Sequence, residues 1–371
     1  MHADVIVIGA GMAGASVAAL LAERRRVLLL EAEERVGYHA TGRSAALFSE
    51  IYGNRSIRAL TRGSRDFLRA PPEGFTDVPL IRPRASLFIA TDRQLETLNG
   101  FAALPDVAPA TRALSASEAL ALCPVLREDC LAAALLEPDS ADLDVNALHQ
   151  GYLRWFRARG GDLRAASPVL GLSRGAGGWR VRTGAEEHAA PVIVNAAGAW
   201  ADELAGLAGV APLGLTPLRR TAALVDPPAG VAVDAWPMVI DIAEAFYFKP
   251  DAGRLLISPA DETPAAPGDA QPEDWDVALA VERIESATTL RIDRLRHRWA
   301  GLRTFAADRS PVVGFCAGAP GFFWLAGQGG YGIQTAPAMA RAAAALIRGE
   351  PLPEDLRALG LAAADVSPAR F

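Results

Sequence analysis

The sequence contains few of the residues from which metal centres and disulfide frameworks are built. Its 371 residues include only three cysteines and five histidines. Cys123, Cys130 and Cys316 form no C-x-x-C pair, and the histidines form no H-E-x-x-H motif. An odd and sparse set of cysteines is typical of a reducing compartment without disulfide bonds. We therefore predict no metal site and no disulfide framework.

An excess of basic residues and a long apolar run are also absent from the sequence. The formal net charge is −6, whereas a nucleic-acid-binding surface is normally basic. No stretch reaches the ~18 apolar residues of a transmembrane helix. Glycines interrupt the apolar first segment, and no basic leader precedes it. We expect no nucleic-acid partner, no integral membrane segment and a cytoplasmic location.

The best-defined motif lies within residues 4–31. Residues 5–8 (Val-Ile-Val-Ile) predict a buried strand, and Gly9, Gly11 and Gly14 follow in the pattern G-x-G-x-x-G before a helix. The first glycine permits a tight turn, the second lets the backbone approach a pyrophosphate, and the third lets helix and strand pack closely. Glu31 ends a second apolar run, about 20 residues on, where an acid would bind ribose hydroxyls.

This motif indicates a dinucleotide site, and the alternative is an ordinary βαβ unit with tight turns. The positive end of the helix dipole and its free N–H groups would bind the pyrophosphate. By itself the motif does not separate NAD from FAD.

Three further segments are rich in small residues. Residues 38–46 contain Arg43 and Ser44, which could reach a phosphate, although the segment could also be a plain loop that enters a helix. Residues 192–200 read as a buried strand followed by a small-residue turn. Residues 327–335 precede an alanine-rich helix expected at 338–347. Successive backbone N–H groups in such turns can hold an anion or a polar ring edge.

Periodicity in the rest of the chain predicts a mixture of helices and strands. Helices are expected at residues 57–68, 144–159 and 277–288, and Ser115 with Glu118 resembles a capping box. Strands are expected at 86–89, across the strand-rich stretch 218–258, and in a β-meander at 167–188.

Together with the N-terminal motif, several of these segments give the chain a resemblance to the flavin-dependent amine and D-amino acid oxidoreductases (the DAO family). That family includes D-amino acid oxidase, glycine oxidase and sarcosine oxidase. The likeness covers nearly the whole chain and is carried by residues 37–46, 144–153, 195–200, 236–238, 246–251, 299–303 and 328–335. Within the family, the chain resembles bacterial FAD-dependent D-arginine dehydrogenase in particular.

The resemblance implies an α/β fold in which a Rossmann-like FAD-binding domain carries a second, α+β substrate domain built on a large antiparallel sheet. This is the DAO-type, glutathione-reductase-like FAD fold. The FAD-binding domain would be discontinuous and comprise residues 1–80, 143–215 and 295–371. The substrate domain would comprise residues 81–142 and 216–294.

FAD is the cofactor that the resemblance implies. A flavin-tethering cysteine would belong near Gly301, and Cys316 lies well past it, so we expect non-covalent FAD. The residues expected to contact FAD are Gly9, Gly11, Ala13, Gly14, Glu31, Ala32, Ala40, Thr41, Gly42, Arg43, Ser44, Ala45, Ala46, Leu47, Val169, Gly198, Gly329, Gly330, Tyr331, Gly332, Ile333 and Gln334.

By the same resemblance, Arg220 and Arg303 match positions that bind a substrate carboxylate, and Tyr52 and Tyr247 match tyrosines that close over the substrate. Arginine suits this role because its guanidinium offers two parallel N–H donors to a carboxylate. The implied reaction is oxidative deamination of a D-amino acid by hydride transfer from Cα to the flavin, which yields a 2-oxo acid and ammonia. No histidine is an obvious base, so solvent or a site water would take the amine proton.

Two departures from the D-arginine enzymes concern the side-chain pocket, which is expected to contain Leu47, Ser49, Ser86, Met238 and Ile240. Those enzymes carry a glutamate where this chain has Ser86, and a histidine where it has Leu47. Losing a paired charge at a desolvated site costs several kcal/mol. We therefore predict that neutral, apolar side chains are favoured over cationic ones, unless Glu50 or Asp241 supplies the missing acid.

Other functions are also compatible with the sequence. In the same fold the chain could oxidise N-methyl amino acids or 2-hydroxy acids. It could also be a flavin-binding assembly protein without turnover, although the carboxylate-binding residues argue against that. A soluble NAD dehydrogenase is a further alternative, against which the turn at 329–334 argues. The electron acceptor, oxygen or a quinone, is not evident from the motifs.

Overall fold

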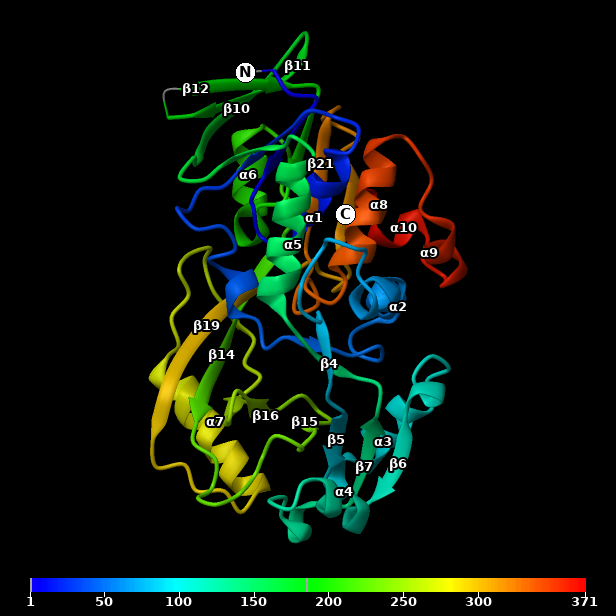
Figure 1. The fold of residues 1–371 in the computed structure, drawn as a ribbon, viewed down its shortest axis with the longest axis vertical. Coiled ribbons are helices and arrows are strands. Elements are labelled where there is room, and N and C mark those ends of the chain that lie inside the picture. The colour runs from blue at the N-terminus through cyan, green and yellow to red at the C-terminus, as the bar shows by residue number, and fades with distance from the viewer. Residues whose placement is uncertain (1, 185) are drawn as a thin grey trace.

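The computed structural model describes residues 2–184 and 186–371, and Figure 1 shows an elongated molecule with two parts along its long axis. Met1 and Ala185 fall within the predicted segments 1–80 and 143–215 and lie outside the described residues. The upper part in Figure 1 contains both ends of the chain, and the lower part is formed by central segments.

A six-stranded sheet forms the centre of the upper part. Its order is β20 (Val312–Phe315), β21 (Phe322–Ala326), β13 (Val192–Asn195), β1 (Val5–Ile8), β2 (Val27–Leu30) and β9 (Asp162–Arg164). Neighbours from β21 to β9 are parallel, and β20 is antiparallel. All residues of β1 and β2 are buried, since both faces of a parallel sheet are covered. The predicted βαβ unit and the strand at 192–194 are confirmed.

Helices pack together on one side of this sheet. In the first βαβ unit, α1 (Met12–Leu21) contacts both α5 (Val145–Ala158) and α8 (Ala336–Ile347), while α2 (Arg55–Arg69) contacts α8. The side chains of Asn54 and Asp144 cap α2 and α5 by accepting hydrogen bonds from backbone N–H groups of the first turn. The helices expected at 57–68, 144–159 and 338–347 are confirmed. The other helices of this part are α6 (Ala201–Leu207), α9 (Glu354–Ala358) and α10 (Ala363–Val366).

The expected β-meander is also confirmed. It is a three-stranded antiparallel sheet of β10 (Val169–Gly175), β11 (Gly178–Thr183) and β12 (Glu186–Ala190) at the upper end of Figure 1.

The lower part is built on a nine-stranded sheet. Along it lie β18 (Thr263–Pro264), β14 (Thr216–Val225), β17 (Arg254–Ser258), β16 (Tyr247–Asp251), β15 (Met238–Asp241), β5 (Ser86–Ala90), β7 (Ala133–Glu137) and β6 (Arg112–Ser115), and β19 (Leu295–Phe305) pairs with β14. The prediction of an antiparallel sheet holds for every pair except β5 and β15, which are parallel.

Helices and a core cover one side of this large sheet. A buried cluster joins Leu87, Val239, Phe248 and Ile257 of the strands to Ile284 of α7 (Asp274–Ala287). The predicted helix at 277–288 is therefore present and begins three residues earlier. The remaining helices are α3 (Leu95–Ala102) and α4 (Ala116–Leu122), and the expected capping box at Ser115 opens α4.

Strand β19 does not follow the predicted domain division. Residues 295–305 pair along β14 in the large sheet, although the division assigned them to the FAD-binding segments. A small sheet of β3 (Leu47–Phe48), β8 (Ala141–Leu143) and β4 (Ile81–Pro83) lies where the chain passes between the two parts. The domain boundaries themselves remain a prediction.

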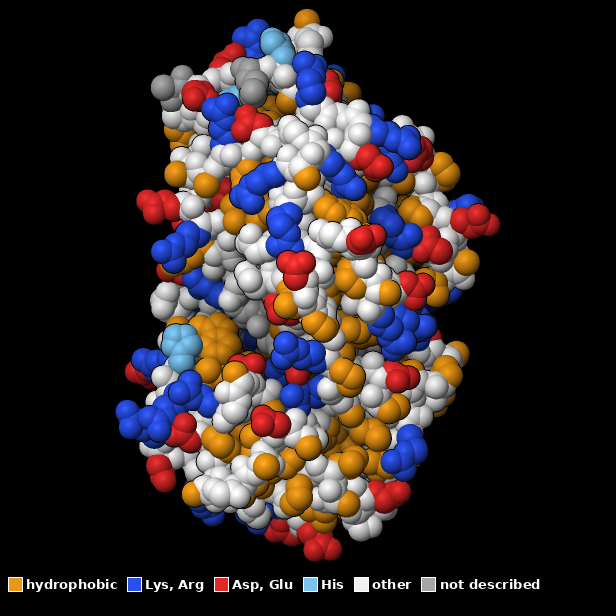
Figure 2. Space-filling model, in the orientation of Figure 1, with side chains coloured by type: hydrophobic (Ala, Val, Ile, Leu, Met, Phe, Trp, Pro, Cys, Tyr) orange, Lys and Arg blue, Asp and Glu red, His pale blue; other side chains and the backbone are white. Residues whose placement is uncertain are grey.

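The visible surface mixes charges of both signs. Figure 2 shows Lys and Arg side chains interspersed with Asp and Glu on the face it displays. Among the described residues, no helix combines the length and the apolar character needed to cross a bilayer.

The packing of α5 gives a stability prediction. A Cβ on Gly151 would lie 2.4 Å from the buried ring of Phe75, so Gly151→Ala should overpack the core and lower the free energy of unfolding by about 1–3 kcal/mol. Gly100 in α3 is the matched control because a Cβ there meets nothing within 4 Å. Gly100→Ala should be neutral or stabilising, by up to about 1 kcal/mol. Urea denaturation measures the free energy of unfolding of both variants. Equal effects would contradict the close packing of Gly151 against Phe75.

Candidate active site

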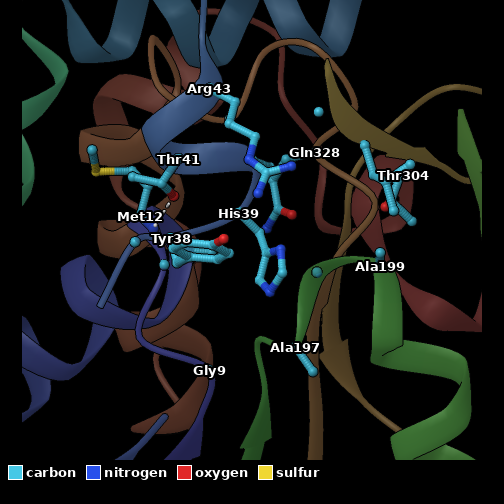
Figure 3. Close-up of a pocket in the computed structure, with 18 of the residues that line it drawn as sticks. Gly9, Met12, Tyr38, His39, Thr41, Arg43, Ala197, Ala199, Thr304 and Gln328 are labelled. Carbon is cyan, nitrogen blue, oxygen red and sulfur yellow. Dashed lines mark hydrogen bonds between the residues drawn. The ribbon is translucent and has the colours of Figure 1, made fainter. Parts of the chain in front are cut away.

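A cavity of about 380 Å³ opens at the edge where β1 and β2 end (Figure 3). Segments that are far apart in the sequence form its walls. They are the N-terminal glycine turn, residues 30–33, residues 37–45, the turn after β13, part of β19 and the glycine turn at 328–333. Ligands of open α/β sheets bind at the carboxyl ends of the strands, which is where this cavity lies.

The glycine turn has the geometry that its sequence predicts. Gly9 has φ +102°, and a Cβ on it would lie 2.4 Å from the carbonyl oxygen of Ala196. A Cβ on Gly14 would lie 1.8 Å from the carbonyl oxygen of Gly9. These contacts make glycine the residue that fits at both positions. Gly11 lines the cavity at the start of α1.

Two polar side chains hold this turn in place. The Thr41 hydroxyl accepts a hydrogen bond from the backbone N–H of Met12 at 2.9 Å, as Figure 3 shows. The carboxylate of Glu31 accepts from the N–H of Ala10 at 2.8 Å and of Glu33 at 3.0 Å. Glu31 lies at the end of β2 on the cavity wall, which is compatible with its predicted place beside a ribose.

Arg43 has protein partners that the sequence did not indicate. Its guanidinium donates to the carbonyl oxygens of Ala270 at 2.8 Å and Ala300 at 2.9 Å, and forms an ion pair with Asp269. These contacts compete with the predicted binding of a phosphate. The carbonyl oxygen of Arg43 accepts from the indole N–H of Trp299 at 3.1 Å, so this arginine joins residues 38–44 to β19.

Most of the residues predicted to contact the cofactor line this cavity. They are Gly9, Gly11, Ala13, Glu31, Ala32, Ala40, Thr41, Arg43, Ser44, Ala45, Val169, Gly198, Gly329, Gly330, Gly332 and Ile333. Ala46, Leu47 and Gln334 line a smaller adjoining pocket instead.

Three of the predicted cofactor residues line neither space. Gly14 lies behind the carbonyl of Gly9, and Gly42 donates its N–H to the carbonyl oxygen of Gly37 at 2.9 Å. The ring of Tyr331 packs edge-on against Tyr52, with the ring centroids 4.7 Å apart. Their surroundings give these three residues structural roles next to the cavity.

Sequence reasoning missed other residues on the cavity wall. Tyr38, His39, Trp200 and Gln328 line it, and Figure 3 shows His39 and Gln328 among the lining residues. The amide nitrogen of Gln328 is buried and has no hydrogen-bond partner within the described part of the chain. A buried donor without a partner is costly, so this atom fits a polar group of a bound cofactor. The available signals were its position within the third glycine cluster and within residues 328–335, which carry the family resemblance.

The smaller pocket, of about 60 Å³, shares part of its wall with the large cavity. Both spaces contact Ser44, Ala45, Arg220, Tyr247, Arg303, Gly330 and Ile333. All four predicted catalytic residues line the smaller pocket: Tyr52, Arg220, Tyr247 and Arg303. A molecule held there would lie directly beside the cofactor cavity.

Arg303 is the arginine of this pocket whose guanidinium is available to bind an anion. It donates to the hydroxyl of Tyr52 at 3.3 Å, and within residues 2–184 and 186–371 no acidic side chain forms an ion pair with it. Burial opposes its charge, but the neighbouring hydroxyls of Tyr52 and Tyr247 outweigh burial and raise the pKa of Arg303. The side chain is therefore a permanent cation.

Arg220 differs because it already has an acidic partner. It donates to the carbonyl oxygen of Asp261 at 2.7 Å and lies 3.2 Å from a carboxylate oxygen of Glu262. Glu262 also pairs with Arg309 at 2.7 Å. Tyr247 is buried beside Arg220, whose guanidinium carbon lies 6.0 Å from the centre of its ring. Burial opposes ionisation of Tyr247, yet the charges of Arg303 and Arg220 lower its pKa.

Four of the five predicted side-chain residues line the smaller pocket, namely Leu47, Ser49, Met238 and Ile240. Ser86 does not, and this part of the prediction is wrong. Ser86 is fully buried, pairs with Glu137 across β5 and β7, and accepts a hydrogen bond from Ser140 at 2.9 Å. Phe88, two residues along the same strand, lines the pocket in its place.

Neither alternative acid reaches the pocket. Glu50 pairs with Arg65 and with Arg62. Asp241 accepts from the side chain of Gln94 at 2.8 Å and from backbone N–H groups of the turn between β15 and β16. The acid that does line the pocket is Glu244, an exposed residue of this turn with φ +55°. The sequence does not predict the position of Glu244, because glutamate rarely adopts the positive φ that places it in this turn.

Comparisons with known proteins agree with this geometry. The family model described as "FAD dependent oxidoreductase" (DAO) matches residues 4–346. The bovine (Bos taurus) "FAD-dependent oxidoreductase domain-containing protein 1" is 30% identical over 176 residues, which span 42% of this chain and 35% of that protein. Glycine oxidase from Geobacillus kaustophilus is 23% identical over 349 residues, or 90% of each chain.

Solved structures show the same fold. The structure of that glycine oxidase superposes with a TM-score of 0.81 at 24% identity and covers 94% of this chain and 95% of its own. L-proline dehydrogenase from P. horikoshii gives a TM-score of 0.84 at 20% identity and covers 100% of this chain and 98% of its own. The predicted DAO-type fold is confirmed. None of these relatives is a D-arginine dehydrogenase, so the likeness at that level remains a prediction.

The unpartnered amide of Gln328 gives a cofactor-binding prediction. Gln328→Leu should weaken FAD binding about tenfold, the value of one hydrogen bond, while the apoprotein keeps or gains stability because a buried orphan donor is removed. Fluorescence titration with FAD and thermal unfolding of the apoprotein measure the two effects. Gln150→Leu, at a half-buried glutamine of α5 that does not line the cavity, is the control. Unchanged FAD affinity in Gln328→Leu would show that the amide does not meet the cofactor.

Proposed function

Because the chain belongs to the family of FAD-dependent oxidoreductases, we propose that it oxidises D-amino acids to 2-oxo acids and ammonia as a D-amino acid dehydrogenase or oxidase. One observation carries the proposal. A small pocket lined by Arg303, Tyr52 and Tyr247 shares a wall with the cavity whose glycine turns suit FAD.

The carboxylate of the substrate would bind Arg303. This guanidinium has no acidic partner among the described residues, and its two parallel donors match a carboxylate. The Tyr52 hydroxyl lies 3.3 Å from the same guanidinium and would complete the binding site. Arg220 is less available because it already donates to the carbonyl oxygen of Asp261 and pairs with Glu262.

The proposed reaction moves a hydride from the substrate Cα to the flavin, which is the chemistry that the cofactor supplies when bound. The residues of the chain hold Cα next to the cofactor cavity, since they fix the carboxylate at one end of a small pocket. No described histidine lines this pocket, so water would take the proton of the ammonium group. The imine released from the site would then hydrolyse to the 2-oxo acid.

Neutral side chains should be favoured over cationic ones. Leu47, Phe88, Met238, Ile240 and Ala260 make most of the wall apolar. A cation placed there would lose its hydration without gaining a buried counter-charge. Glu50 and Asp241 do not line the pocket, and Glu244 is exposed at the turn, where water screens its charge.

Non-covalent binding of FAD is part of the proposal. None of the three cysteines lines the cavity: Cys123 is buried in the lower core, and Cys130 and Cys316 are partly exposed elsewhere. The electron acceptor, oxygen or a quinone, and a cytoplasmic location also remain proposals.

Anaerobic mixing of the purified holoprotein with candidate substrates tests the function. The panel contains D-amino acids, N-methyl amino acids and 2-hydroxy acids. Bleaching of the flavin absorbance by D-amino acids supports the proposal. Bleaching by the N-methyl or hydroxy compounds alone would favour those oxidations, and a flavoprotein that nothing bleaches would favour a binding role.

Substitution of the free guanidinium should be severe. Arg303→Lys keeps the positive charge but removes the two parallel N–H donors of the guanidinium. The value of kcat/KM for the best D-amino acid should therefore fall about 100-fold, as expected for the loss of a desolvated charge contact. Arg220→Lys should cost less, because Arg220 is already engaged with Glu262 and with the carbonyl oxygen of Asp261. Exposed Arg93→Lys is the control. A larger loss of kcat/KM in Arg220→Lys than in Arg303→Lys would contradict the assignment of Arg303 as the main carboxylate-binding residue.

Side-chain charge should decide the substrate order. We expect kcat/KM for D-leucine or D-methionine to exceed that for D-arginine by at least about tenfold, because the apolar wall offers a cation no buried partner. Rapid-mixing reduction of the flavin measures all three. If D-arginine proves the best substrate, the preference is wrong and Glu244 becomes the acid to examine.

A further inference from the structure

A loop of the lower part forms a piece of the wall of the cofactor cavity. Residues 266–272 (Ala-Pro-Gly-Asp-Ala-Gln-Pro) lie between β18 and α7, and we call them the strap. Gly268 and Ala270 of the strap line the cavity. The glycine turns of the same cavity belong to the upper part, so the strap joins the cofactor site from the other part of the molecule.

The strap is anchored in the large sheet at its two ends. Before it, the N–H of Ala265 donates to a backbone carbonyl oxygen of β14 at 3.0 Å, and after it, Glu273 and Asp276 pair with Arg219 of β14. Among the described residues, no backbone–backbone hydrogen bond involves residues 266–272, and two of these seven residues are prolines, which have no N–H. A segment with so few hydrogen bonds opens at a low cost in free energy.

Two residues of the upper part hold the middle of the strap. The guanidinium of Arg43 forms an ion pair with Asp269 and donates to the carbonyl oxygen of Ala270 at 2.8 Å. The hydroxyl of Tyr38 donates to Asp269 at 3.4 Å, and the guanidinium carbon of Arg43 lies 5.2 Å from the centre of the Tyr38 ring. Tyr38 and Arg43 themselves line the cavity (Figure 3). These contacts fasten the strap to the cavity wall.

Arg43 is the fixed half of this contact. It also donates to the carbonyl oxygen of Ala300 in β19 at 2.9 Å, and a Cβ on Gly301 would lie 3.2 Å from its own Cβ. Its side chain is 14% exposed, against 48% for that of Asp269. The hydrogen bond from Arg43 lowers the pKa of Asp269, so this carboxylate is charged at neutral pH. Asp269 is therefore the half that leaves when the strap opens.

We propose that the strap is a gate on the cofactor cavity, and that Asp269 is the positioning residue that keeps the gate closed by binding Arg43 and Tyr38. The gate sets how fast FAD enters and leaves. None of the cysteines lines the cavity, so the closure of the site is a means of retaining a cofactor that has no covalent tether there. This role concerns the cofactor and is independent of which substrate is oxidised.

Asp269→Asn tests the gate because it removes the charge and keeps the shape of the side chain. When the holoprotein is diluted, the rise in flavin fluorescence gives the release rate of FAD, its final extent gives Kd, and the two together give the association rate. A weakened latch opens more often for entry and for exit. Both rates should therefore increase at least about threefold, the scale of a partly exposed ion pair, while Kd changes less than about twofold.

Asp355→Asn is the matched control. It breaks an ion pair with Arg341 at 2.7 Å, its side chain is 51% exposed, and it lines neither pocket. Neither rate should change in this variant.

Three outcomes for Asp269→Asn would overturn the proposal. Faster release with unchanged association would mean that Asp269 supports the bound cofactor and does not gate its passage. Slower release would mean that Asp269 acts only as a negative charge beside an anionic cofactor. Unchanged rates would mean that its contacts do not hold the strap. All of these rates are measured without substrate, so they stand whether or not D-amino acids bleach the flavin.

A double-mutant cycle tests whether Asp269 acts through Arg43. Arg43→Gln should accelerate release at least as much as Asp269→Asn, and adding Asp269→Asn to it should change the rate less than about twofold, since the two residues share one contact. Effects that multiply would contradict the latch. Salt gives a second readout: between about 0.05 M and about 0.5 M KCl, the difference in release rate between wild type and Asp269→Asn should shrink, because screening weakens the ion pair. A difference that salt leaves unchanged would also contradict it.

Discussion

The close approach of two turns at the edge of the parallel sheet is the constraint on which the rest of the site depends. A Cβ on Gly9 would lie 2.4 Å from the carbonyl oxygen of Ala196. The turn after β1 therefore packs directly on the turn after β13, and the start of α1 faces the same space. Because parallel strands end at one edge, this contact gathers the cofactor-binding segments there. The nine-stranded sheet contributes residues of β14, β16 and β19 to the wall of the same cavity.

Features of the fold that are determined locally could be predicted from the sequence. The first βαβ unit combines strand, glycine turn and helix signals within residues 4–31, and no distant contact is needed to interpret it. The same is true of the helices that Asn54 and Asp144 cap and of the meander at 169–190. The pairing of β19 with β14 could not be predicted in this way, because it joins strands about 80 residues apart.

The family resemblance predicted which residues come together in the site, but it did not predict what their side chains contact. Tyr52, Arg220, Tyr247 and Arg303 come together as expected, since each is placed by the fold. Ser86 does not line the pocket because it is fully buried and its hydroxyl is bound by Ser140, a contact that strand position alone does not reveal. The sequence also does not predict which residues a long side chain will contact. Arg43 pairs with Asp269, which lies 226 residues away in the chain.

The charges around the small pocket also bear on the missing base. Arg220 is paired with Glu262, a carboxylate that Arg309 shares, whereas Arg303 has no ion-pair partner in the described pocket wall and would pair with a substrate carboxylate. The ammonium group of the proposed substrate would then lie in a mostly apolar space without a buried counter-charge. Desolvation disfavours the charged form of an amine and lowers its pKa. A pocket of this kind promotes the loss of the ammonium proton to water, so it requires no histidine or carboxylate beside Cα.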